Sequence, residues 1–446
     1  MSGPGRHADR ALLPADGPLR HTRTRSRPEM TRRAGRLIGM HVLVPGSAQM
    51  VAGNRPLGRV VVGVWIALWA VVLAALLTWL VQREVLVGVA TSATGLTVIQ
   101  VGLLLVAIGW LAVTIDVLRL TRLLRLTAWA RPVVAGVLVV AAVAGGGAAA
   151  WGAYAAGVAR GAIVSVFQER TPAQAASAKT VEQYDVLLLG MDRPRGGGAL
   201  YPKSVSVVSI DAETGAATII GVPTSLKDVP FPADSPMHRL YPKGYRACIA
   251  APCTLGDVYA EARVVGASLY PDAKSQGTTA AAEAMRDAVS GATGLDIGFT
   301  ASVDTTALGA LIDALGGVTV DVPASGASPA FPAGATPMRG SRVVSYLRES
   351  GGRNGAEQVD RVVRVEHALL TQANPANALL QFRTVAAASS GALRTDLPQD
   401  TVTELAVLGL KTQTQPVREV RLVPPAVDPA KPDFGAVQRL VAAATD

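Results

Sequence analysis

The chain has 446 residues, half of them apolar and only 17% charged, which is enough for about three folding units. A mean hydropathy of +0.33 excludes a disordered chain and is too high for an ordinary soluble enzyme. Two cysteines and five scattered histidines exclude a disulfide-rich scaffold and show no metal-binding cluster. The net charge of +9 is uneven, because residues 1–171 carry 18 Lys and Arg against 6 Asp and Glu. The basic excess therefore belongs to the N-terminal part alone.

Three long apolar segments lie in this N-terminal part, which also holds all six tryptophans. They cover residues 60–81, 98–118 and 133–157, and at about 1.5 Å per residue each is long enough to cross a hydrocarbon core of about 30 Å. A removable signal peptide is a poor alternative, because the first segment begins far from the N-terminus and two more follow. We expect three transmembrane helices within residues 58–160. Residues 1–57 are expected to form a basic, disordered stretch with a short re-entrant or interfacial turn near its end.

The arginines predict the orientation of these helices. Nine arginines lie in the first 36 residues, and four more lie in the loop 119–131, which has no acid. Because basic loops stay in the cytoplasm, an odd number of spans places everything after residue 157 outside. We expect a multi-pass protein of the cell membrane with a cytoplasmic N-terminus and an extracellular C-terminal domain. Nucleic-acid binding by the arginine-rich tail is the alternative, but interleaved aromatics and a helix-turn-helix pattern are missing, so no nucleic-acid partner is expected.

Residues 161–183 are expected to be a linker, and residues 184–446 a domain of alternating strands and helices. Strands are predicted at 184–190, 203–211 and 216–222 from their apolar or alternating pattern. An amphipathic helix at 278–294, a strand at 297–304, a helix that Asp304 caps and a Gly pair ends, and a strand at 317–323 follow. Further helices are predicted at 343–347, 358–372, 401–410 and 434–444, with a late strand at 417–423. This alternation predicts a layered α/β fold.

The outer domain lacks the usual catalytic signatures, because it contains no G-x-S-x-G and no Walker loop. What remains is a set of basic residues in polar loops near strand ends, which includes Arg193, Arg195, Arg348, Arg361 and Arg364. Forked guanidinium groups suit a phosphate better than a proton-transfer substrate.

Three motifs in this domain resemble the LytR-CpsA-Psr family of bacterial envelope proteins, and the match extends over about residues 180–390. The motifs are LIDALGGVTVDVP at 311–323, SYLRE at 345–349 and DRVVR at 360–364. The resemblance implies a layered α/β/α extracellular domain with a mixed central sheet. It also implies a transferase that moves a polyprenyl-pyrophosphate-linked glycopolymer onto peptidoglycan or another wall acceptor, in cell envelope biogenesis. The multi-span N-terminus and the composition resemble actinobacterial members of the family.

The resemblance assigns roles to particular residues. Arg348, Arg361 and Arg364 stand at catalytic, pyrophosphate-binding arginines, and Asp192 stands at a carboxylate that binds Mg²⁺. Lys203 takes the place of another arginine, and Arg195 is a further candidate for binding the pyrophosphate. For Arg361 and Arg364 the alternative is a solvated helix face, and for Asp192 it is a turn residue.

Five positions depart from the family pattern, and they bear on the chemistry more than on the fold. A valine replaces a Mg²⁺-binding aspartate, Thr and Ser replace an Arg-Asp pair, and an arginine and a glutamine are also lost, at Val205, Thr224, Ser225, Ser350 and Val365. Because Mg²⁺ needs oxygen ligands, Val205 and Ser225, which replace expected carboxylates, weigh against the Mg²⁺ that the resemblance implies.

Two functions of different classes remain open: an active envelope transferase, and a catalytically silent homologue that binds lipid pyrophosphate or a partner. The replacements favour the second. A third reading follows the older description of the family as transcriptional attenuators or other envelope-related regulators, which an extracellular location makes physically implausible. A sensor with an extracellular ligand domain would lack a cytoplasmic output domain.

The two cysteines, Cys248 and Cys253, lie five positions apart in a loop that we expect to be exported. Because disulfides persist outside the cytoplasm, we predict that they form a disulfide. The alternative is a pair of buried free thiols.

Overall fold

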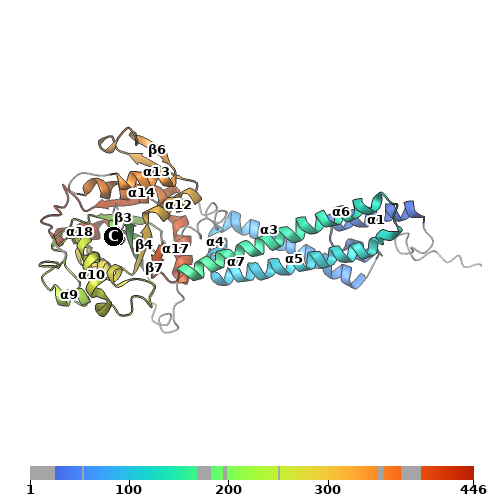
Figure 1. Ribbon diagram of the computed structural model, residues 1–446, viewed down its shortest axis with the longest axis horizontal. Helices are drawn as coiled ribbons and strands as arrows, with labels where there is room; N and C mark the ends of the chain where they lie inside the picture. Colours follow the sequence, from blue (N-terminus) through green and yellow to red (C-terminus); the bar gives the residue numbers. More distant parts are fainter. Residues whose placement is uncertain are drawn as a thin grey trace, which may run out of the picture. The chain divides into compact units, whose positions relative to one another are not determined.

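The computed structural model of this chain (Figure 1) describes residues 26–52, 55–167, 182–193, 198–249, 252–349, 355–372 and 393–445. The chain divides into two compact units. A helical unit consists of Met1–Arg83 and Thr97–Ala156, and an α/β unit consists of Glu84–Leu96 and Gly157–Asp446.

Among the described residues, three helical stretches are long and apolar enough to cross a membrane, judged by length and composition. They are Arg55–Val81, Ala93–Arg125 and Ala130–Val164, and each contains one of the predicted segments. Helices α3 (Arg55–Val81) and α5 (Ala93–Thr121) are followed by α6 (Ala130–Ala141) and α7 (Ala148–Val166), which a π-helical turn at Ala142–Gly147 joins. That turn coincides with the Gly-rich run, and the indole of Trp110 donates a hydrogen bond to the carbonyl of Ala141 at 2.8 Å beside it. A short helix, α4 (Arg83–Thr91), lies between α3 and α5.

The expectation of disorder through residue 57 is wrong for the described residues 26–52. Helix α1 (Arg27–Leu43) begins at a capping box of Ser26 and Glu29, and α2 (Ser47–Ala52) follows a turn at Gly46, where φ is +93°. Between its arginines, α1 carries apolar residues at helical spacing. Met30, Ala34 and Leu37 are buried in one cluster with residues of α5 and α6. Residues 1–25 lie outside the described ranges.

The predicted linker is helical at its start. Helix α7 continues to Val166, and the first strand begins at Gln183. Residues 168–181 lie outside the described part of the chain.

The α/β unit is built on a six-stranded sheet in the order β7-β4-β1-β2-β3-β8. The strands are β1 (Gln183–Asp192), β2 (Tyr201–Asp211), β3 (Ala217–Val222), β4 (Phe299–Asp304), β7 (Leu393–Thr395) and β8 (Val417–Arg421). The sheet is mixed, because β1 pairs antiparallel with β2 but parallel with β4, and β3 pairs parallel with β8. The predicted strand at 317–323 is not part of this sheet: β5 (Val318–Val322) pairs with β6 (Gly334–Met338) in a separate hairpin.

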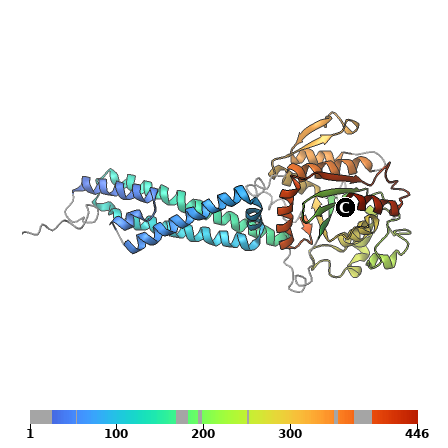
Figure 2. The same ribbon diagram turned by 180° about the vertical axis from the view of Figure 1, so that it is seen from behind.

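Helices cover both faces of the sheet, as Figures 1 and 2 show. Side chains of β1 and β2 point alternately to the two sides: Leu187 and Val207 are buried in one apolar cluster, and Tyr184 and Val208 in another. The first cluster lies against α10 (Leu255–Leu269), α11 (Ala280–Thr293) and α18 (Phe434–Thr445). The other face is covered by α12 (Thr305–Ala314), α13 (Gly340–Arg348), α14 (Ala356–Gln372) and α17 (Gln399–Thr412). The predicted layered α/β/α fold with a mixed central sheet is confirmed.

Candidate functional site

Asp192 and Arg348 meet at the end of the sheet where β1 finishes. The guanidinium of Arg348, at the last position of α13, donates from Nε to Oδ2 of Asp192 at 3.0 Å and from Nη2 to Oδ1 at 2.8 Å. The backbone N–H of Arg193 also donates to Oδ1, at 2.9 Å. Burial alone would raise the pKa of Asp192, but these hydrogen bonds hold it below its ordinary value. Two residues that the sequence placed in the site are therefore joined as a forked ion pair.

The residues around this pair do not fit the expected Mg²⁺ site. Both oxygens of Asp192 already accept from Arg348. Val205 is 2% exposed within the apolar cluster against α10 and α11, so no oxygen ligand stands there. Within the described ranges no three His, Cys, Asp or Glu side chains lie close enough to hold a metal ion.

Lys203 lies beside the same pair but contacts a different group. Its ammonium is 3.4 Å from the backbone carbonyl of Arg348, to which it donates. Arg195 and Ser350 lie outside the described residues. The structure thus brings Asp192, Lys203 and Arg348 together and does not place Arg195.

Arg361 and Arg364 line a cleft of about 360 Å³ on the α14 side, together with Tyr346, Asp360 and Arg421. Arg361 is only 6% exposed, so the solvated-face alternative is wrong for it. Its guanidinium donates to the carbonyl of Glu349 and stacks 5.7 Å from the centroid of the Tyr346 ring.

The arginines of this cleft, which we call the α14 cleft, already form ion pairs with carboxylates. Arg364 donates to Oδ2 of Asp360 at 2.8 Å, and Nε of Arg421 lies 2.8 Å from the other oxygen of Asp360. Arg361 has Glu357 at 3.5 Å and Glu349 at 3.7 Å. An anion that enters this cleft has to displace these internal ion pairs.

A larger cleft, of about 590 Å³, opens on the other side of the sheet between α10, α11 and the ends of β1 and β4. Its walls are mainly apolar, and they include Met191, Leu200, Ala262, Ala281 and Ala282. A volume of this size is typical of a small-molecule or lipid site. We call it the arginine-rimmed cleft, because Arg193, Arg263 and Arg394 also line it.

The guanidinium groups of these three arginines are available to a ligand. All three residues are exposed, and none forms an ion pair with an acid in the described part of the chain. Asp304 also lines the cleft, but one of its oxygens caps α12 by accepting from the N–H of Thr306 at 2.8 Å. The arrangement of exposed cations over apolar walls suits an amphiphilic anion.

Sequence reasoning missed Arg263 and Arg394. Arg263 lies on α10, and Arg394 on the edge strand β7. Neither element was predicted. The capping box of Thr254 and Asp257 at the start of α10 was the local signal that could have revealed Arg263, whereas the three residues of β7 offer none.

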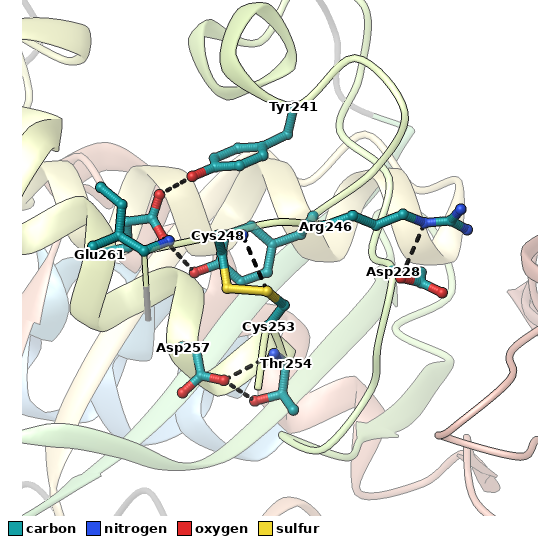
Figure 3. The surroundings of a disulfide bond; sticks show 10 residues. Asp228, Tyr241, Arg246, Cys248, Cys253, Thr254, Asp257 and Glu261 are labelled. Atoms are coloured by element: carbon teal, nitrogen blue, oxygen red, sulfur yellow. Dashed lines mark hydrogen bonds and ion pairs between the residues drawn. A yellow bond between two sulfur atoms is a disulfide. The ribbon is translucent and has the colours of Figure 1, made fainter. Parts of the chain in front are cut away.

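Cys248 and Cys253 pair in a disulfide next to α10 (Figure 3). The loop that they close is also held by a buried carboxylate, that of Glu261. This carboxylate accepts from the hydroxyls of Tyr241 and Tyr245 and from the backbone N–H of Ile249. Burial and the carboxylate of Glu261 raise the pKa of Tyr241 to about 12.

Residues 262–424 match the model of the LytR_cpsA_psr family. A search of the curated proteins finds no match to the chain. TagV from B. subtilis is 16% identical with a TM-score of 0.40, covering 59% of this chain and 96% of that one. TagT bound to LI-WTA is 14% identical with a TM-score of 0.40, covering 63% and 93%. Protein gbs0355 from Streptococcus agalactiae is 16% identical with a TM-score of 0.38, covering 54% and 77%.

Proposed function

We propose that the α/β unit binds a polyprenyl-pyrophosphate-linked glycopolymer outside the cell membrane. The prenyl chain would lie along the apolar walls of the arginine-rimmed cleft, and the pyrophosphate would contact its arginines. The proposal rests on one observation: Arg193, Arg263 and Arg394 surround an apolar cleft without an acidic partner in the described chain. The family match at residues 262–424 supports the choice of ligand.

The chemistry of the arginines accounts for the recognition. Each guanidinium offers parallel N–H donors that match two oxygens of a phosphate, and each charge-assisted hydrogen bond contributes about 1.5–3 kcal/mol. Burial of the prenyl chain against alanine and leucine side chains adds about 25 cal/mol per Å² of apolar surface. The two contributions explain why a prenyl pyrophosphate would bind more tightly than a free pyrophosphate or a free polyprenol.

The same domain is expected to transfer the glycopolymer to peptidoglycan or another wall acceptor slowly, if at all. Val205 provides no oxygen ligand, and Asp192 is neutralised by Arg348. Loss of a single donor to a transition state costs about 10²–10³ in rate. We therefore favour the catalytically silent homologue over the active transferase.

The three long apolar helices support a multi-pass membrane anchor. With the N-terminus in the cytoplasm, the α/β unit would face the lipid-linked precursor on the outer side.

A binding experiment on the full chain in detergent tests the proposal. Geranylgeranyl pyrophosphate serves as a soluble probe, with inorganic pyrophosphate and geranylgeraniol as the two half-ligands, each with MgCl₂ or with EDTA. We expect the prenyl pyrophosphate to bind more tightly than either half-ligand, and EDTA to leave its affinity unchanged. Arg263→Ala and Arg394→Ala should each weaken binding about tenfold.

Two further variants test whether the ligand binds in the arginine-rimmed cleft or in the α14 cleft. Arg342→Ala removes an exposed cation elsewhere on the domain and should leave affinity unchanged. If Arg361→Ala weakens binding while Arg394→Ala does not, the pyrophosphate binds in the α14 cleft, and the proposal is wrong about the site. Glycopolymer transfer to peptidoglycan at a rate that depends on Mg²⁺ would refute the silent reading.

A further inference from the structure

A third cleft, of about 900 Å³, lies next to α11 and is lined by acids. Asp234 and Ser235 come from the loop before α9 (Pro236–Leu240), Glu283 and Asp287 from α11, and Asp296 from the turn before β4. Among the described residues that line it, Arg286 is the only cation. We call it the acidic cleft.

The carboxylate of Asp287 is held in place by two neutral donors. The hydroxyl of Ser235 and the hydroxyl of Tyr270 both donate to its Oδ2, each at 2.6 Å. No described residue donates to Oδ1. Because two neutral hydroxyls orient the carboxylate through Oδ2 alone, Asp287 keeps Oδ1 as an acceptor for a ligand.

Glu283 is the second observation that indicates a ligand. It is 4% exposed, and its Oε2 accepts from Arg286, which also lies 3.4 Å from Oδ2 of Asp396. Its Oε1 is buried and has no hydrogen-bond partner. A buried acceptor without a partner costs about 1–3 kcal/mol, so a donor that enters the acidic cleft and reaches this oxygen would recover that energy.

The residues that line the acidic cleft favour an organic cation over a metal ion as its ligand. Within the described ranges the acids do not converge as a metal site does. Between them lie apolar groups, among them Phe231, Leu295 and Ile297. Separated carboxylates with apolar and aromatic surfaces between them match an ammonium group on an alkyl chain, whose methylenes pack against the walls and whose charge is attracted to the aromatic rings.

We propose that the acidic cleft binds an organic cation, an ammonium group carried on an alkyl chain. The ammonium donates to Asp287 and Asp234, and a second donor of the ligand reaches Glu283. This site is separate from the arginine-rimmed cleft and does not rest on the function proposed for it.

Equilibrium dialysis of the full chain in detergent with radiolabelled cadaverine, a five-carbon diamine, tests the proposal. Saturable binding is expected. Asp234→Asn and Asp287→Asn should each weaken it about tenfold, because each removes one charge-assisted contact. Glu213→Gln removes one exposed charge on the β2–β3 hairpin and should change the affinity less than twofold. Asp287→Asn also alters the hydrogen bonds to Ser235 and Tyr270. If that variant misfolds, Asp234→Asn, at an exposed position, still tests the proposal.

Calcium chloride alone, titrated against bound cadaverine, separates the two kinds of cation. Displacement of cadaverine by Ca²⁺ at equal or lower concentration would identify a metal site and overturn the proposal. Absence of saturable cadaverine binding, or unchanged affinity in a folded Asp234→Asn variant, would also overturn it. The affinity for geranylgeranyl pyrophosphate should stay the same in both variants, which keeps the outcome distinct from the function proposed above.

Discussion

Asp192, Glu283 and Glu366 have pKa values that their surroundings move in opposite directions. The hydrogen bonds from Arg348 outweigh burial at Asp192 and lower its pKa. Burial raises the pKa of Glu283 to about 7 against the effect of Arg286, and burial raises that of Glu366 to about 7 although Ser206 donates to it at 2.5 Å. The Asp192 pair stabilises the fold above the unfolded pKa of the carboxyl and loses this effect as the pH falls. Glu283 and Glu366 have raised pKa values, so their contribution to the stability of the fold is lost as the pH rises.

Glu366 offers a clear test of this linkage. In the unfolded chain a glutamate ionises near pH 4.5, whereas Glu366 keeps its proton to about pH 7, so its contribution to stability falls as the pH rises from 4.5 to 7. Glu366→Gln should leave the free energy of unfolding at pH 4.5 nearly unchanged and raise it by about 3 kcal/mol at pH 8. Denaturant unfolding at the two pH values measures this. The exposed Glu213→Gln is the control, and an equal change in both variants would contradict the argument.

At the scale of elements, two helices cross at a point where only glycine fits. A Cβ on Gly340, at the start of α13, would lie 1.8 Å from the carbonyl oxygen of Gly309 in α12, and one on Gly309 would lie 2.8 Å from Val344. Because the obstacle at Gly340 is backbone, it cannot be relieved by a side-chain rotation. This crossing positions Arg348 against Asp192.

Gly340→Ala should therefore destabilise the domain by about 3 kcal/mol. Gly409→Ala is the matched control, because nothing lies within 4 Å of a Cβ at that position of α17. We expect the control to raise stability by up to about 1 kcal/mol through helix propensity. Thermal unfolding of both variants decides the matter, and similar melting temperatures would show that α12 and α13 can separate without cost.

The loop next to α10 joins two constraints, the disulfide and the carboxylate of Glu261. We predict that the purified chain, unfolded without a reductant, shows no free thiol toward a maleimide reagent. Reduction should lower stability by about 2 kcal/mol at most, because the disulfide closes a short loop. Two reactive thiols per chain would instead show that Glu261 and its tyrosines hold the loop without a covalent link.

At the scale of the whole molecule, the arginine asymmetry and the three long apolar helices of the described residues predict a cytoplasmic N-terminus and an extracellular α/β unit. An alkaline-phosphatase fusion after residue 183 should be active, because that reporter folds only outside the cytoplasm. A cytoplasmic reporter at the same junction should be silent. The reverse pattern would place the α/β unit inside and remove the basis for an envelope function.

The local sequence determined much of the α/β unit, because its elements depend on neighbours in the chain. A continuous apolar run indicated β1, an alternating pattern indicated β2, and Asp304 capped α12 as predicted, accepting from Thr306. Helix α11 ends at Gly294, where φ is +78°. Capping bonds and side-chain periodicity act over a few residues, so they can be read without a fold.

Only the tertiary structure decided the partners of the charged residues. Asp192 pairs with an arginine 156 positions away, and Arg361 is buried on a helix whose pattern equally allowed exposure. The three arginines of the arginine-rimmed cleft come from a loop, from α10 and from the edge strand β7. An ion pair or a cleft forms where distant segments cross, and the energy that selects the crossing comes from burial of the whole core. The sequence by itself therefore determined the α/β character and the apolar helices, and the packing of the core decided which charges are neutralised and which remain exposed.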